Sequence, residues 1–173
     1  MGFLDWLEEL PLSQWVAQSE VGYPMMLSIH SIGMAAVVGL LLMFDLRVLG
    51  LARGVPVSFF RKVMPFAWAG FFLNLVSGVL LFNSTAHRLV DNWPFLSKMV
   101  CILAAGAVTW LLWRAIGSVE EAGGGASADA QTAIVASPVV KALALASIIL
   151  WLAAITFGRL IAYVMDYMIL NAK

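Results

Sequence analysis

Residues 24–44 read PMMLSIHSIGMAAVVGLLLMF, a run without any Asp, Glu, Lys or Arg. An α-helix rises about 1.5 Å per residue, so roughly 20 apolar residues cross the hydrocarbon core of a bilayer. The run therefore predicts a membrane-spanning helix, which we extend to 24–46. Three more apolar runs follow it between charged residues. The predicted spans are 24–46, 59–83, 94–114 and 138–168.

The composition of the whole chain agrees with a lipid environment. Of 173 residues, 62% are hydrophobic and 12% are charged, whereas a soluble domain is about half apolar and a quarter charged. Disorder, a secreted disulfide scaffold and a soluble enzyme are excluded. Ten basic side chains balance ten acidic ones, so we expect no nucleic-acid partner. Cys101 is the single cysteine, which excludes an intramolecular disulfide and a Cys-rich metal site.

The sequence predicts an all-α fold, an integral membrane four-helix bundle formed by one domain of residues 1–173. A lipid-exposed segment must satisfy its own backbone, and the runs lack the alternation of barrel strands. Before the first span, Phe3, Trp6 and Leu7 alternate with acidic residues, which predicts a short interfacial helix. The Gly-rich stretch 118–137 predicts a flexible loop outside the membrane.

Positive charges near the helix ends predict the orientation. Most of them fall on one side of the membrane: Arg47, Arg53, Arg61, Lys62, Arg114 and Lys141. The positive-inside rule then places both termini in the periplasm of a bacterial inner membrane. The bilayer is the expected partner, and the large lipid-facing area predicts a homo-oligomer, with any redox partner left unidentified.

Two ionisable side chains lie at matching depth inside the predicted spans. His30 and Arg159 each sit on the order of 10 Å below the same helix ends, with Lys98 and His87 above them. Intramembrane ionisable groups normally turn inward, toward a site. We therefore expect His30 and Arg159 to face each other across the bundle.

The residues around His30 predict a cofactor. Met26 and Met34 stand four residues before and after His30, on the same helix face. Imidazole and thioether groups ligate haem iron and also copper(I). The leading hypothesis is a haem b-binding redox or electron-transfer protein in which Met26, Met34 or His87 supplies the second ligand. Arg159 and Lys98 would lie near the propionates, and Tyr163 could hydrogen-bond to Arg159 or a propionate.

Two alternatives stay open. The first is a copper-binding protein that uses His30, its methionine neighbours and His87. The second is a cofactor-free structural or assembly subunit, in which His30 makes an interhelical hydrogen bond and the methionines fill space. An oxidoreductase activity also stays open. Asp45 is interpreted as the ion-pair partner of a neighbouring arginine, and a single such carboxylate does not support a proton pump. Asn74, with Ser77 and Gly78, predicts a close helix crossing.

Several strings resemble an uncharacterised family of small four-helix bacterial inner-membrane proteins, a domain of unknown function. They cover nearly the whole chain: PLSQW at 11–15, HSIGM at 30–34, FDLRVLG at 44–50, SGVLLF at 77–82, FLSK at 95–98 and Gly158-Arg159. The resemblance implies importance for His30, Asp45, Arg47, Lys98 and Arg159. The start of the first span is also similar to copper-resistance and succinate-dehydrogenase-anchor bundles, whose histidines hold haem or copper.

Overall fold

A computed structural model describes residues 2–51, 54–122 and 137–171, and within these ranges the regular structure is entirely helical. Four long helices dominate it. They are α3 (Gly22–Val48), α4 (Val57–Ser84), α6 (Trp93–Ala122) and α8 (Pro138–Asn171). Each contains a segment long and apolar enough to cross a membrane. The predicted fold class, an all-α membrane four-helix bundle, is confirmed.

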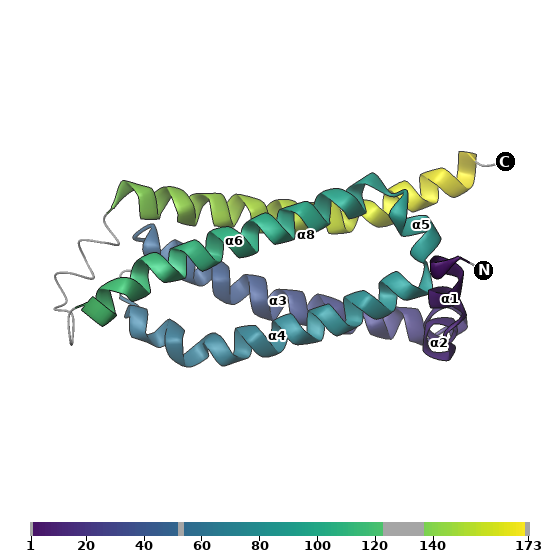
Figure 1. The fold of residues 1–173 in the computed structure, drawn as a ribbon, viewed down its shortest axis with the longest axis horizontal. Helices are drawn as coiled ribbons and strands as arrows, with labels where there is room; N and C mark the ends of the chain where they lie inside the picture. Colours follow the sequence, from purple (N-terminus) through teal and green to yellow (C-terminus); the bar gives the residue numbers. More distant parts are fainter. Residues whose placement is uncertain (1, 52–53, 123–136, 172–173) are drawn as a thin grey trace.

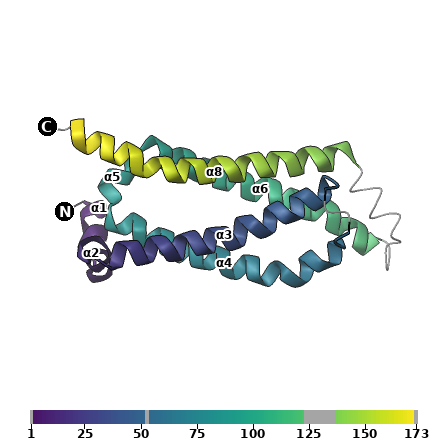
Figure 2. The same ribbon diagram turned by 180° about the vertical axis from the view of Figure 1, so that it is seen from behind.

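The four helices form two antiparallel pairs (Figure 1). Helix α3 packs along α4, helix α6 packs along α8, and α3 against α8 is the main contact between the two pairs. On the other side α4 and α6 barely touch along their length. Figure 2 shows the α3 and α8 side, and Figure 1 the α4 and α6 side. The bundle is therefore closed along one side and looser along the other.

Three short helices lie at the end of the bundle where both termini are found, which we call the N-terminal end. They are α1 (Phe3–Glu9), α2 (Pro11–Gln18) and α5 (Ala86–Val90) (Figure 1). The prediction of one interfacial helix is corrected to two. The break falls at Leu10, whose ψ of 136° is extended, because a residue before proline disfavours helical geometry.

Helix α6 continues beyond its predicted end at residue 114 and runs to Ala122. The predicted loop 118–137 is thus helical over its first five residues, and the stretch 123–136 lies outside the described residues. The helix extends past the apolar run because Glu120 and Glu121 are good helix formers. The length of an apolar run predicts how much of a helix lies in lipid. The helix itself can continue beyond that run.

Two apolar clusters hold the long helices together. At the loop end, opposite the N-terminal end, Phe44 of α3, Phe60 of α4, Leu112 of α6 and Ala144 of α8 pack into one buried cluster. Nearer the middle, Val37, Val38, Leu41, Ala105 and Trp151 join α3, α6 and α8. At the N-terminal end, the rings of Phe82 and Phe95 stack between α4 and α6, with centroids 5.5 Å apart. Helices α4 and α6 are thus linked at both ends and separate between them.

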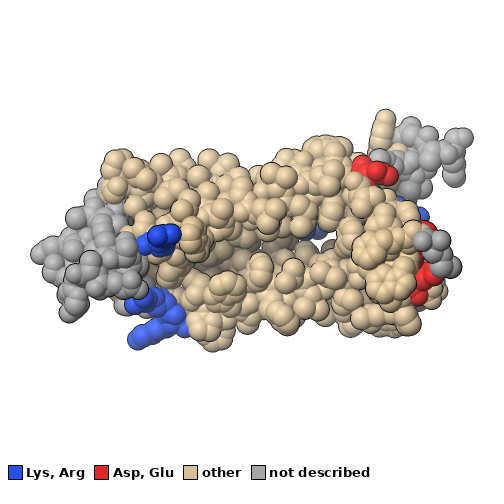
Figure 3. Space-filling model, in the orientation of Figure 1, with Lys and Arg blue, Asp and Glu red and all other residues tan. Residues whose placement is uncertain are grey.

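Charged side chains gather at the two ends of the bundle. In the view of Figure 3, most basic atoms lie near the loop end and the acidic atoms lie near the N-terminal end, while the middle is largely uncharged except for a few basic atoms in a hollow. This distribution fits a chain whose middle lies in hydrocarbon and whose ends lie in water.

Candidate functional site

His30 is buried where α3 crosses α4, with 9% of the residue exposed. Glycines allow this close crossing. A Cβ atom at Gly33 would lie 2.8 Å from the backbone nitrogen of Asn74 and from the carbonyl oxygen of Gly70. A Cβ at Gly78 would lie 3.1 Å from Cε1 of His30. The glycines therefore leave room for the imidazole ring, and the close crossing predicted near Asn74 is confirmed.

His30 and Asn74 bond reciprocally across this crossing. The Asn74 amide donates to the carbonyl oxygen of His30 at 2.7 Å, and Nδ1 of His30 lies 3.0 Å from the carbonyl oxygen of Asn74. The Ser77 hydroxyl lies 3.2 Å from the same Nδ1. A carbonyl oxygen can only accept, so Nδ1 carries the hydrogen. The tautomer is therefore fixed, and Nε2 presents a lone pair.

Nε2 of His30 points toward Lys98 of α6. The Lys98 ammonium lies 3.4 Å from Nε2 and can only donate, which agrees with an accepting Nε2. The side chain of Lys98 passes beside Gly158 of α8, where a Cβ would lie 3.5 Å from Cε. We call His30, Asn74, Ser77 and Lys98 the His30 cluster. It joins α3, α4 and α6 inside the apolar part of the bundle.

A cavity of about 30 Å³ adjoins the His30 cluster. It lies between the two helix pairs, at the level where α4 and α6 separate. Its walls come from α3, α4, α6 and α8: Met34, Val37, Val38, Phe71, Asn74, Lys98, Ile102, Trp151, Ala154 and Ile155. The surface is hollowed between α4 and α6 in Figure 3. We call this opening the α4/α6 window, and it faces the lipid side of the bundle.

Arg159 and Tyr163 do not take part in the His30 cluster. Both side chains are exposed, Tyr163 to 72%. The expectation that Arg159 faces His30 is corrected, because the position of α8 that faces the interior here is Gly158. The next residue is rotated by about 100° around the helix axis. Arg159 thus has the depth of His30 in the bundle but points outward. The positive charge beside His30 comes from Lys98 instead.

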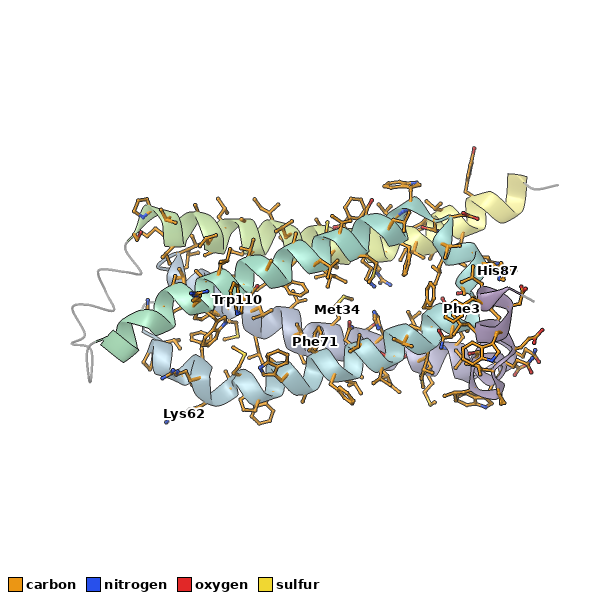
Figure 4. All side chains as sticks on the ribbon, viewed as in Figure 1. Phe3, Met34, Lys62, Phe71, His87 and Trp110 are labelled. Carbon is orange, nitrogen blue, oxygen red and sulfur yellow. The ribbon has the colours of Figure 1, made fainter. Side chains whose placement is uncertain are left out.

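The other predicted ligands lie in different places. Met34 lines the cavity. Met26 is half-buried and lies on α3 one turn nearer the N-terminal end than His30. His87, on α5, lies at the N-terminal end beside Phe3, well away from Met34 (Figure 4). Its two ring nitrogens lie 3.2 Å from a carboxylate oxygen of Asp5 and 3.3 Å from one of Glu8. The structure therefore does not bring His87 to His30.

A second polar cluster lies nearer the loop end, and the sequence did not predict it. Asp45 of α3 is 1% exposed, and neither carboxylate oxygen has a hydrogen-bond partner. The Ser147 hydroxyl of α8 lies close to the Asp45 carboxylate but outside hydrogen-bonding geometry. The same hydroxyl lies 3.4 Å from that of Thr109 on α6, which accepts from Nε1 of Trp151 at 3.4 Å. We call these four residues the Asp45 cluster.

The ion pair expected for Asp45 is not seen with Arg47. The guanidinium of Arg47 donates through Nε to the carbonyl oxygen of Val55, in the connection between α3 and α4. Arg114, the other inner arginine of the prediction, lies over the ring of Trp110 at 5.5 Å and is exposed. Asp45 thus lacks the hydrogen-bonded arginine that would stabilise its charge.

No protein-family model, curated protein or solved structure matches this chain. Within the described residues, no group of three or more His, Cys, Asp and Glu side chains is arranged to hold a metal ion. The functional argument therefore rests on the two polar clusters and on the cavity between the helix pairs.

Proposed function

We propose that this chain is a membrane protein that binds haem b through Nε2 of His30. The observation that carries the proposal is the bond from Nδ1 of His30 to the carbonyl oxygen of Asn74. Metal-ligating histidines usually donate their other ring N–H in this way, which fixes the ring and directs the free lone pair at the metal. When bound, the haem would supply one-electron chemistry.

Lys98 favours an anionic ligand over a bare metal ion. Its ammonium lies 3.4 Å from the nitrogen that would bind the metal. A copper(I) ion at that nitrogen would meet this positive charge in a medium of low dielectric constant, where like charges repel strongly. A haem carries two propionates, and Lys98 could pair with one of them. Copper binding, the alternative predicted from the sequence, would have to displace Lys98 without this gain.

The α4/α6 window gives an apolar macrocycle a route from the bilayer. The cavity behind it is about 30 Å³, which is room for a water molecule or two. A haem is far larger, so binding requires α4 and α6 to move apart between their two end contacts. Helices α4 and α6 make few contacts with each other, so their separation would break fewer contacts than a separation of α3 from α8.

The proposal is tested on the full chain, expressed in cells that make haem and purified in detergent. We expect a Soret absorption band from the wild-type protein and its loss in His30→Ala. His87→Ala is the matched control, because His87 is the chain's other histidine and lies outside the His30 cluster. Iron and copper are quantified on the same samples.

Four results would count against haem binding. A colourless wild-type protein would contradict it, and so would a Soret band that His30→Ala and His87→Ala weaken equally. Copper without iron would select the copper-binding alternative. If His30→Ala changes stability but no spectrum and no metal content, the chain is better described as a structural or assembly subunit.

We also propose that the chain lies in a bacterial inner membrane with its N-terminal end in the periplasm, as a homo-oligomer. The basic loop end and acidic N-terminal end support this orientation. Alkaline phosphatase fused after residue 173 should be active, because the enzyme requires the periplasm. The same fusion after residue 117, at the loop end, should be inactive. The reverse pattern would overturn the orientation.

A further inference from the structure

The carboxylate of Asp45 is the least satisfied polar group in the described part of the chain. Both of its oxygens are buried and both lack a hydrogen-bond partner. Every other buried polar side chain of the described residues has such a partner by the same criterion. A bare carboxylate in an apolar interior is strongly unfavourable, so it needs a positive partner.

Two hydroxyls lie on the side of α3 that carries Asp45: that of Ser147, close to Asp45, and that of Thr109, next to Ser147. Asp45, Ser147 and Thr109 come from three different helices, α3, α8 and α6. Ser147 is 0% exposed, and its hydroxyl lies 3.4 Å from that of Thr109. The Trp151 indole donates to Thr109, which leaves the Thr109 hydroxyl free to direct its own hydrogen elsewhere. Carboxylate and hydroxyl oxygens suit hard monovalent cations and protons.

The basic side chains of the neighbouring elements are directed elsewhere or lie at the surface. Arg47 of α3 bonds to the carbonyl oxygen of Val55. Arg114 of α6 lies over Trp110, while Arg61 of α4 and Lys141 of α8 are exposed. None of them provides a hydrogen bond to either Asp45 oxygen. Within the described residues, no basic side chain therefore hydrogen-bonds to Asp45, and a cation from solution can supply the positive partner.

We infer that Asp45, Ser147 and Thr109 form a binding site for a monovalent cation, either Na⁺ or a proton. The site is distinct from the His30 cluster, since the two centres are about 15 residues, or roughly 22 Å, apart along α3. The inference does not depend on haem binding. Na⁺ would use the Asp45 carboxylate together with the two hydroxyls, whereas a proton would reside on the carboxylate and be donated to Ser147.

The test measures thermal unfolding of the full-length protein in detergent at constant ionic strength. Sodium chloride is compared with choline chloride at pH 8, in the wild-type protein and in Asp45→Asn. A cation that binds the folded state raises the Tm with its concentration. For a Na⁺ site we expect the Tm of the wild-type protein to rise with Na⁺, and that of Asp45→Asn to stay constant.

The second arm identifies a proton site. Without Na⁺, the Tm of the wild-type protein should fall as the pH is raised, because the proton leaves the carboxylate and its stabilisation is lost. The Tm of Asp45→Asn should change less over the same pH series. Thr156→Val is the matched control, because its hydroxyl lies on α8 too but is exposed and bonds within its own helix. It should retain the cation dependence of the wild-type protein.

If Asp45→Asn does not fold, Ser147→Ala replaces it, because this variant keeps the carboxylate and removes one hydroxyl. We then expect half-maximal stabilisation to require at least tenfold more Na⁺, or the pH midpoint to shift. The inference is overturned if neither Na⁺ nor pH distinguishes the wild-type protein from the variant. It is equally overturned if the variant shows the full wild-type response.

Discussion

His30 and Asp45 both lie on the inner face of α3, but their surroundings differ in kind. Both ring nitrogens of His30 have partners, from α4 and α6. Asp45 is more deeply buried, and its two oxygens have none. One helix thus carries a satisfied polar group near one end and an unsatisfied one near the other.

This difference separates two ways in which a polar side chain is held in lipid. The His30 cluster is completed by the protein, through a crossing that only glycines permit. The cost of burying its polar atoms is offset by hydrogen bonds, and the lone pair of Nε2 is directed at the Lys98 ammonium. The Asp45 cluster is not completed by the protein and needs a cation. Changes in the first should disturb architecture, and changes in the second should alter the response to solution conditions.

The largest effect is expected at the helix crossing on which the His30 cluster depends. In Gly33→Leu the new side chain would collide with backbone atoms of Gly70 and Asn74, which cannot move independently of α4. Overpacking of this kind should lower the free energy of unfolding by about 3 kcal/mol. Unfolding in mixed detergent and SDS measures it. Gly39→Leu is the control, since a Cβ there has nothing within 4 Å, and it should remain close to wild type.

A smaller effect of opposite sign is expected at Asp45. In Na⁺-free buffer at pH 8, Asp45→Asn should raise the free energy of unfolding by roughly 1 to 3 kcal/mol. The variant removes a buried charge that has no hydrogen-bonded partner. The same SDS unfolding assay measures the change. A large loss of stability would instead support the ion pair predicted from the sequence. It would contradict the conclusion that the protein leaves Asp45 without a partner.

Asn74→Ala should destabilise the protein by about 1 kcal/mol, because the His30 carbonyl loses its 2.7 Å bond to the Asn74 amide. The bond from Nδ1 goes to the backbone of residue 74 and should survive. Haem content per chain should therefore fall much less than in His30→Ala. Equal losses of haem in Asn74→Ala and His30→Ala would show that the amide, rather than the backbone carbonyl, orients the ring.

The smallest effect is expected at His87, which bridges Asp5 and Glu8 at the surface. Its ring nitrogens join α5 to α1 through these two contacts, and His87→Gln should weaken them. Because the contacts are solvent-exposed, we expect the free energy of unfolding to change by well under 1 kcal/mol.

Amide hydrogen exchange in α1, measured at a single pH, can detect this change. Exchange should be faster in His87→Gln than in the wild-type protein. Arg88→Gln is the control, because Arg88 is the exposed neighbour of His87, and its exchange should match that of the wild-type protein. Equal exchange in His87→Gln and the wild-type protein would show that these contacts do not hold α1 in place.

The sequence predicted the spans and much of the His30 cluster for simple physical reasons. Four apolar runs bounded by charges mark the membrane-spanning segments within a few residues. A chain in lipid must satisfy its own backbone hydrogen bonds, and a helix is the simplest way to do so. His30, Asn74 and Lys98 were recognisable as polar residues inside those runs. Residue count placed Lys98 above His30, and the length of the lysine side chain brings its ammonium to 3.4 Å from Nε2 of His30.

Residue count does not predict how each helix is rotated about its axis relative to its neighbours. The wrong expectation for Arg159 follows from this. Arg159 has the depth of His30 but points outward, since packing against Lys98 assigns the inward position to Gly158. Ser147 and Thr109 were overlooked because a single hydroxyl in a helix is usually satisfied by its own backbone. The spacing of Ala144, Ser147 and Trp151 along α8 matches one helix face, which was the available signal.

Titration of purified, haem-free protein with haem b tests the central claim most directly. If Nε2 of His30 is the ligand, the wild-type protein and His87→Ala should both show a saturable Soret shift at one haem per chain. His30→Ala should show none. A shift of the same size and saturation in His30→Ala, or no saturable shift in the wild-type protein, would contradict the assignment of His30 as a haem ligand.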